Sequence, residues 1–250
     1  WTYNAASEIG SLSPNKGQLD TRVTISGTLL LGKNDGTTIV SAAFGDVAAT
    51  VVPGSNQTEV VVVCSSGTAG VGDVTIEADS GATAVLKNGF TQLEDGKIDS
   101  VDPGKGQGGT NVVVEGSRLL GGGAVVTAAT LAGYDAEVKS SSGTKVVLVA
   151  GEGSAKTGDV TLVANTGASV SLADGWEQQA AGEIDAVSPE VGQLGSTVEI
   201  TGSALRGGGS NVVSVSLAGV AVATLKSESD TQVVVVAAAS SAQTGAVVLT

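Results

Sequence analysis

The sequence lacks histidine and methionine, and its only cysteine is Cys64. Without histidine, the usual general base and the most versatile metal ligand are missing. A single cysteine excludes a disulfide within the chain and a cysteine cluster for zinc. We therefore expect this chain to be no enzyme, with no catalytic residue and no cofactor.

Basic residues are also scarce, with 12 Lys and Arg against 25 Asp and Glu in 250 residues, which gives a formal net charge of −13. Such a chain repels nucleic-acid phosphates and anionic membrane surfaces. No run of about 18 apolar residues without charge or glycine occurs, so no transmembrane helix is expected. The composition thus predicts no nucleic-acid partner and no membrane insertion in this segment.

Only six residues are aromatic, whereas 37 are glycine, and the apolar residues are mostly Val and Ala. Val favours strands and Gly favours the tight turns between them. No long stretch shows helical periodicity, but residues 43–51 alternate between apolar and polar, as a half-buried strand does. These features predict an all-β fold.

Three segments of the chain open alike, with IGSLSPNKGQ from Ile9, IDSVDPGKGQ from Ile98 and IDAVSPEVGQ from Ile184. Later blocks match in the same order, as VTISGTLL (23–30), VVVEGSRL (112–119) and VEITGSAL (198–205) show. Matches in one order at fixed spacing predict a tandem array. In the first repeat we expect strands near residues 9–12, 23–26, 40–44, 47–51, 60–63, 74–78 and 83–86. Seven short strands separated by turn residues suggest an antiparallel β-sandwich.

The repeats resemble the IPT/TIG family, the immunoglobulin-like domain of plexins, Rel-type transcription factors and many microbial surface proteins. The third repeat carries its pattern of Ile184, Ser188-Pro189, Gly192, TVEITG (197–202), Leu205 and Leu217-Ala218-Gly219, and the first repeat has Phe44-Gly45 at the hairpin. The resemblance implies three tandem immunoglobulin-like β-sandwich domains. It also implies an extracellular or cell-surface location.

The repeats set the expected domain boundaries. We predict a tail of a preceding repeat (1–8), repeat 1 (9–90), a connector (91–97), repeat 2 (98–176), a connector (177–183) and repeat 3 (184–250) without its last strand. Trp1 precedes Ile9 by eight residues, as Phe90 precedes Ile98, and Thr250 aligns with Val163. We expect the ends to be completed by a longer parent chain or by a neighbouring molecule. The short connectors predict a semi-rigid rod.

Few residues are candidates for chemistry. GKGQGG (104–109) matches a dinucleotide pattern, but that pattern needs a strand before it and a helix after it, so we interpret it as a turn. Carboxylates at the second junction form a weak calcium candidate, with solvated surface charge as the alternative: Glu94, Asp95, Asp99 and Asp102. Asn56 heads a glycosylation sequon.

The apolar and aromatic side chains are expected to have structural roles. Cys64 aligns with alanine in the other repeats, so we expect it to be buried. We expect the recurrent aromatic residues, Trp1, Phe90 and Trp176, to pack at or beside the junctions.

Three functions remain open. The first is a structural module of an extracellular stalk, surface layer or filament, with other copies or flanking repeats of the same protein as partners. The second is an adhesin or receptor ectodomain that binds a glycan or protein ligand through loops at one end of a sandwich. The third is an accessory region of a larger secreted enzyme.

Overall fold

The computed structural model describes residues 5–32 and 36–250, and all of its regular elements are β-strands. The all-β prediction is thereby confirmed. The strands form three units in chain order, which hold β1–β8, β9–β16 and β17–β23. Among the described residues, no helix is long and apolar enough to span a membrane.

The first unit is a sandwich whose strands follow the order β1-β3-β6-β5-β4-β7-β8-β2. Its strands are β1 (Glu8–Ser13), β2 (Lys16–Gly17), β3 (Arg22–Thr28), β4 (Ile39–Phe44), β5 (Val47–Val51), β6 (Glu59–Val63), β7 (Gly70–Ala78) and β8 (Thr83–Gln92). All seven strands expected from the sequence are present. The additional strand, β2, runs parallel to the end of β8, whereas the other pairs are antiparallel.

The second unit repeats this arrangement, in the order β10-β16-β15-β12-β13-β14-β11-β9. Its strands are β9 (Lys97–Asp102), β10 (Lys105–Gly106), β11 (Asn111–Ser117), β12 (Val126–Leu131), β13 (Tyr134–Ser141), β14 (Lys145–Val149), β15 (Lys156–Ala164) and β16 (Ser169–Gln178). Strand β10 is the counterpart of β2, and β16 is the counterpart of β8. Both pairs, β2–β8 and β10–β16, are parallel.

The third unit has two smaller sheets, β17-β18-β22-β21 and β20-β19-β23. Its strands are β17 (Glu183–Ser188), β18 (Thr197–Ser203), β19 (Val215–Leu217), β20 (Val220–Ala221), β21 (Thr224–Glu228), β22 (Gln232–Val236) and β23 (Val247–Leu249). Strand β23 is the counterpart of β15 but is much shorter.

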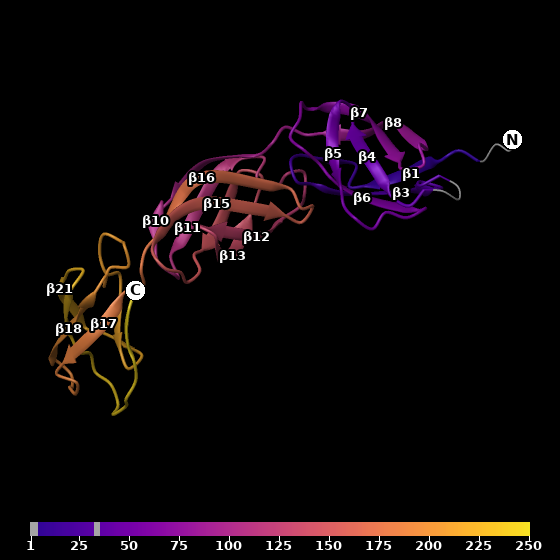
Figure 1. Ribbon diagram of the computed structural model, residues 1–250. Coiled ribbons are helices and arrows are strands. Elements are labelled where there is room, and N and C mark those ends of the chain that lie inside the picture. The colour runs from indigo at the N-terminus through magenta and orange to yellow at the C-terminus, as the bar shows by residue number, and fades with distance from the viewer. Residues whose placement is uncertain (1–4, 33–35) are drawn as a thin grey trace.

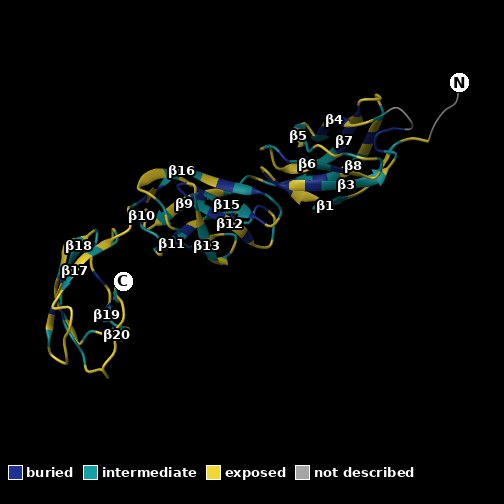
Figure 2. Cartoon of the chain, turned by 60° about the horizontal axis from the view of Figure 1, so that its bottom comes forward, coloured by how far each residue is buried: buried dark blue, intermediate teal, exposed yellow. Residues whose placement is uncertain are grey.

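Each unit has a hydrophobic core of its own, made largely of alternate residues of its strands. In the first unit Val23 and Ile25 of β3 lie beside Val62 and Val60 of the neighbouring strand β6, and all four side chains are fully buried. Cys64 lies at the end of this core and is 2% exposed, which confirms its expected burial. Figure 2 shows the buried residues as separate groups along the chain.

The units follow one another end to end, with a bend between the second and the third (Figure 1). The arrangement is the predicted rod, curved at its second joint. The recurrent aromatics do not bridge the joints: Phe90 and Trp176 are 1% and 0% exposed and belong to the cores of their own units. Trp1, the third of these residues, lies outside the described residues.

Candidate functional site at the joints between repeats

The first joint is formed by the turn after β2, which docks on the second unit. The side chain of Gln18 is fully buried there, and its Nε2 donates to the carbonyl oxygen of Ser169 at 3.2 Å. Two backbone hydrogen bonds also cross the joint, from Arg22 N to Thr166 O at 2.9 Å and from Ser169 N to Leu19 O at 3.3 Å. Backbone pairing of this kind fixes one unit against the next.

The acidic connector strengthens the first joint. Asp95 accepts a hydrogen bond from Leu19 N at 3.0 Å and another from the Ser66 hydroxyl. On the other side, Arg118 of the second unit donates to Asp95 O at 3.2 Å and pairs with Glu94 at 3.1 Å. Exposed ion pairs contribute little stability. The hydrogen bonds of Asp95 therefore hold the connector in one conformation.

The second joint uses the equivalent glutamine. Gln107, the counterpart of Gln18, accepts a hydrogen bond from Gly182 N at 2.7 Å through its Oε1 atom. Its side chain also lies against Gly207, where a Cβ atom would be 2.7 Å from Gln107 Nε2. At the first joint Gln18 lies in the same way against Gly121, where a Cβ atom would be 3.2 Å from Gln18 Nε2. Both joints therefore pack a glutamine of one unit against a glycine of the next.

Glycine permits the close approach at both joints. A Cβ atom on Gly96 of the first connector would lie 2.6 Å from the carbonyl oxygen of Arg118, and one on Gly182 would lie 2.6 Å from that of Ala204. Gly207 has a φ of +57°, a left-handed conformation that favours glycine. The joints therefore depend on small residues in the connector and in the turn that it meets.

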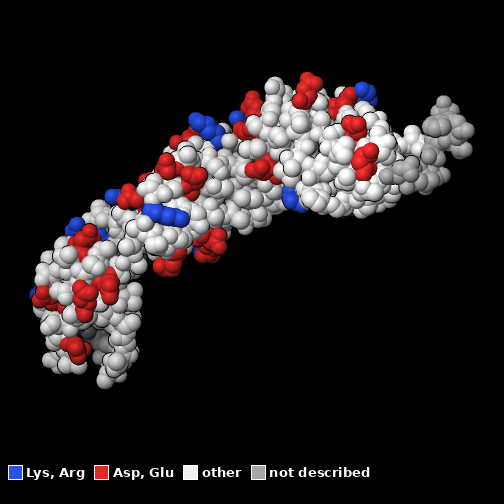
Figure 3. Space-filling model, viewed as in Figure 1, with Lys and Arg blue, Asp and Glu red and all other residues white. Residues whose placement is uncertain are grey.

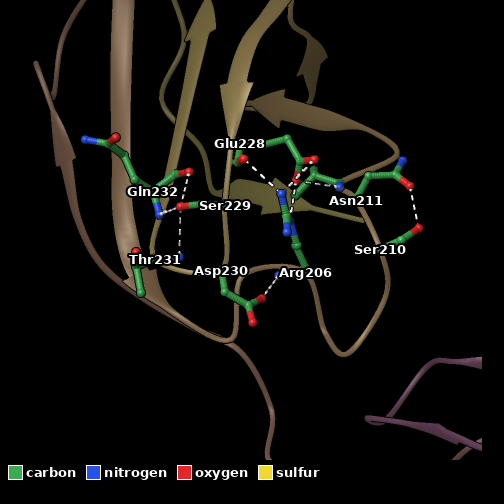
Figure 4. Close-up of polar contacts among 9 residues, drawn as sticks. Arg206, Ser210, Asn211, Glu228, Ser229, Asp230, Thr231 and Gln232 are labelled. Atoms are coloured by element: carbon green, nitrogen blue, oxygen red, sulfur yellow. Dashed lines mark hydrogen bonds and ion pairs between the residues drawn. The ribbon is translucent and has the colours of Figure 1, made fainter.

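In the third unit an ion pair holds the turn that faces the second joint (Figure 4). Arg206 Nε donates to Glu228 Oε2 at 2.8 Å, and Arg206 Nη2 donates to Glu228 O at 3.0 Å. The same carboxylate accepts from Val212 N at 3.0 Å. The hydrogen bond from Arg206 holds the pKa of Glu228 below its usual range. This network fixes the loop that begins at Gly207.

The four carboxylates of the calcium candidate differ in their hydrogen-bond and ion-pair partners. Glu94 and Asp95 form the first joint, whereas Asp99 pairs with Lys97 at 2.6 Å and Asp102 is exposed. Among the described residues, no three Asp, Glu, His or Cys side chains gather as a metal ion would require. The structure therefore gives these residues separate roles as hydrogen-bond and ion-pair partners.

Asn56, the glycosylation candidate, lies in an exposed turn before β6. Its Oδ1 accepts hydrogen bonds from Thr58 N at 2.8 Å, Thr58 Oγ1 at 2.9 Å and Glu59 N at 2.9 Å. The amide nitrogen, which carries the sugar in a glycosylated asparagine, takes part in none of these bonds. Glycosylation of Asn56 stays a prediction.

The joint residues were not singled out as functional by the sequence. The segment GKGQGG does form a turn, but Gln107 within it is a joint residue rather than part of an inert loop. The available signal was the Gly-Gln pair that recurs at the same place in all three repeats. A turn can require glycine but does not require glutamine, so the recurring glutamine was the signal for a contact outside the unit.

Comparison with known families confirms the resemblance seen in the sequence. The model of the IPT/TIG domain matches residues 7–91, 97–175 and 183–250. Comparison with the curated protein sequences gives no significant match.

Solved structures with similar folds include the plexin A4 full extracellular region, with 16% identity and a TM-score of 0.49, covering 93% of this chain and 21% of that chain. A second is the Bacteroides ovatus mixed-linkage glucan utilisation locus SGBP-B in complex with a mixed-linkage heptasaccharide, with 18% identity, a TM-score of 0.29 and 91% and 57% coverage. A third is Gamma-CGTase from Alkalophilic bacillus clarkii, with 13% identity, a TM-score of 0.31 and 71% and 27% coverage. This chain thus spans less than two thirds of each. At these identities and TM-scores, none of the three indicates what this chain binds.

Proposed function

Because the chain belongs to the IPT/TIG family, we propose that it is a non-enzymatic spacer in an extracellular or cell-surface protein. Its three units form a curved rod that holds other parts of an assembly at a set distance. The observation that carries this proposal is the repeated joint, in which Gln18 packs against Gly121 of the second unit and Gln107 packs against Gly207 of the third.

The first joint indicates how such a contact holds one unit against the next. The side chain of Gln18 is fully buried, and hydrogen bonds from Gln18 and Arg22 reach backbone carbonyl groups of the second unit. A hydrogen bond contributes about 0.5–1.5 kcal/mol to stability. Connectors of this length leave little freedom once the glutamine is docked. The proposal is therefore a rod whose units keep a set orientation, with a bend at the second joint.

The surface also favours a spacer over a sugar-binding role. Sugar-binding sites commonly use exposed aromatic rings. Of the four aromatic residues that the structure describes, Phe44, Phe90 and Trp176 are buried, and Lys156 covers the ring of Tyr134 at 4.5 Å. Acidic side chains are scattered over the visible face of all three units (Figure 3). Such a surface suits a solvated rod.

Distance distributions between spin labels test the proposal. In a Cys64→Ala background, labels at Val85 and Ser171 span the first joint, and labels at Ser171 and Ser227 span the second. All three label sites are exposed. We expect a narrow, single-peaked distribution across each joint. Broad distributions at both joints, as for units on flexible tethers, would show that the chain is no rod.

Matched variants test whether the glutamine side chains restrict motion at the joints. Gln18→Ala should broaden the distribution across the first joint and leave the second unchanged, and Gln107→Ala should do the reverse. Gln193→Ala is the control, because this exposed third-repeat counterpart contacts no following unit in the structure described. If Gln193→Ala broadens the distance distribution across either joint as much as the other two variants do, the glutamine contacts do not set the orientation of neighbouring units.

A further inference from the structure

The first unit has a cavity beside the turn between β4 and β5, with a volume of about 230 Å³. The stacked rings of Phe44 and Phe90 form its inner wall and are buried in the core. Asp46, Thr68 and Gly70 also line it and are exposed, so the cavity is open to solvent on their side. An apolar cavity of about 150 Å³ already binds benzene. This cavity therefore has room for one flat ring with a short arm.

The second unit fills the corresponding place with its own side chains. Two pairs of segments correspond in the repeats, AFGDV (43–47) with TLAGY (130–134) and GTAGVG (67–72) with GSAKTG (153–158). The pairing of β4 with β5 has the same register as that of β12 with β13. Tyr134 thus stands where the first unit has Val47, and Lys156 stands where the first unit has Gly70.

The side chains of Tyr134 and Lys156 pack together in the second unit. The ring of Tyr134 lies on Gly153, where a Cβ atom would be 2.4 Å from Tyr134 Cδ2. The hydroxyl of Tyr134 accepts a hydrogen bond from Ser154 N at 3.2 Å. The ammonium group of Lys156 lies 4.5 Å from the ring centroid and 3.5 Å from the position of a Cβ atom on Gly133. A flat ring, a hydroxyl and a cation thus occupy this place together.

The first unit lacks the ring and the cation but keeps residues that suit them. Thr68 stands in the place of Ser154 and has a hydroxyl as well. Asp46 stands in the place of Gly133, so its carboxylate belongs beside the space that the ammonium group takes in the second unit. Gly70 has no side chain to enter that space. The first unit therefore offers an anionic partner for a cation that its own chain does not supply.

A buried amide group at the same cavity also lacks a partner. Gln92 lines the cavity and is 4% exposed, and its Oε1 accepts no hydrogen bond from any described residue. Its counterpart in the second unit, Gln178, accepts one from Trp176 Nε1 at 2.9 Å. Buried polar atoms are normally hydrogen-bonded. This end of the first unit is therefore short of a polar group as well as a ring.

We propose that the cavity of the first unit binds a small aromatic amine, with a flat hydroxylated ring and an ammonium group on a short arm. The ring lies beside Val47, with its hydroxyl at Thr68, and the ammonium group lies against Asp46. The net charge of −13 attracts a cation of this kind. The second unit does not bind it, because Tyr134 and Lys156 fill the place. This site is separate from the glutamine contacts at the joints, so it does not depend on the role as a spacer.

Titration of the whole 250-residue protein with tyramine, a phenol with an aminoethyl arm, tests the proposal by NMR spectroscopy. We expect saturable shifts of the backbone amides at residues 44–47 and 67–72 and of the Gln92 side-chain amide, with a Kd of about 1 mM or below. Amides of residues 131–134 and 153–158 in the second unit should not shift. 4-Ethylphenol, which lacks the ammonium group, should bind at least about threefold more weakly than tyramine.

Three variants locate the binding. Asp46→Asn should weaken tyramine binding by about threefold to fivefold and leave 4-ethylphenol binding unchanged. Glu59→Gln is the matched control, because it removes the same charge from an exposed residue of the first unit that does not line the cavity. Gly70→Lys supplies an ammonium group from the chain itself and should weaken tyramine binding by at least about tenfold. A Cβ atom at this position meets no atom within 4 Å, so the fold tolerates the change.

Three results would overturn the proposal. One is the absence of saturable shifts at about 10 mM tyramine, or shifts centred outside the residues of the cavity. Another is 4-ethylphenol binding as tight as that of tyramine, or equal weakening by Asp46→Asn and Glu59→Gln, because either shows that Asp46 recognises no cation. The third is undiminished binding to Gly70→Lys, because the ligand then does not use the place that Tyr134 and Lys156 fill in the second unit.

Discussion

The first and second units fill the same end of their cores with different pairs of side chains. The first pairs Phe90 with Phe44, and the second pairs Trp176 with Leu131. The indole Nε1 of Trp176 also donates to Gln178 Oε1 at 2.9 Å. Gln92 is the counterpart of Gln178, and its buried Oε1 accepts no hydrogen bond from any described residue.

This difference predicts strong coupling between two substitutions in the first unit. Phe90→Trp alone should destabilise it by about 1–3 kcal/mol, because the larger ring is forced against Phe44. Phe44→Leu alone should cost a similar amount, about 1–3 kcal/mol, through the space that it leaves. Together they restore the volume and let the new indole donate to Gln92, which contributes about 0.5–1.5 kcal/mol. We expect the double variant to be at least as stable as the parent.

Native-state hydrogen exchange should measure the stability of these variants in the intact protein. It is chosen because the three units need not unfold in a single transition. The slowest amides of β3 and β6 report the free energy of unfolding of the first unit, and those of β11 and β14 serve as the internal reference. A double-mutant cycle should give a favourable coupling at least equal to the sum of the two single costs, about 2–6 kcal/mol. Adding Gln92→Met to the double variant keeps the volume and should remove the hydrogen-bond part of the gain. Additive costs for the two single variants would refute the packing argument.

Three further predictions concern single groups. The hydrogen bond from Arg206 lowers the pKa of Glu228 in the folded state. The stabilisation by ionised Glu228 is therefore present above the pKa of the unfolded state and is lost as the pH falls through the pKa of the folded state. Acid titration of the unfolding of the third unit should show this loss, and Glu228→Gln should abolish it. Burial raises the pKa of Cys64 to about 12, so at pH 8 a bulky thiol reagent should label the native protein far more slowly than the urea-unfolded protein; equal rates would contradict the burial. Gly96→Ala would place a Cβ atom 2.6 Å from a backbone oxygen of the second unit and should broaden the label distances across the first joint, whereas Gly143→Ala, with no atom within 4 Å of its Cβ, should not.

The strands could be predicted from the sequence because their signals are local. Valine-rich runs, the alternation of apolar and polar residues, and the recurring Gly and Ser turns located each strand of the first unit within a few residues. The exception is the end of β8, which extends to Gln92, beyond the predicted end at residue 86. That extension depends on pairing with β2 and β7, which are far apart in sequence. Local periodicity carries no information on such pairing.

The joints could not be predicted in the same way. The Gly-Gln pair was visible as a recurrence, but its partner at the first joint, Ser169, lies 151 residues from Gln18 in the sequence. The role of Asp95 was equally hidden, because a carboxylate that accepts backbone hydrogen bonds looks in the sequence like any solvated charge. Only the relative orientation of two folded units brings these groups together.

The contacts at the joints rely mainly on backbone atoms, one glutamine and several glycines, and each unit keeps its core to itself. A copy of one unit could therefore be inserted beside another without redesigning either interior, provided that it brought a Gly-Gln turn and the glycines that meet it. Substitutions in the strands can accumulate between copies when they compensate one another within a core, as the exchange of Phe44 and Phe90 for Leu131 and Trp176 illustrates. Gene duplication can thus lengthen or shorten the protein in steps of one unit while the spacing between neighbouring units stays the same.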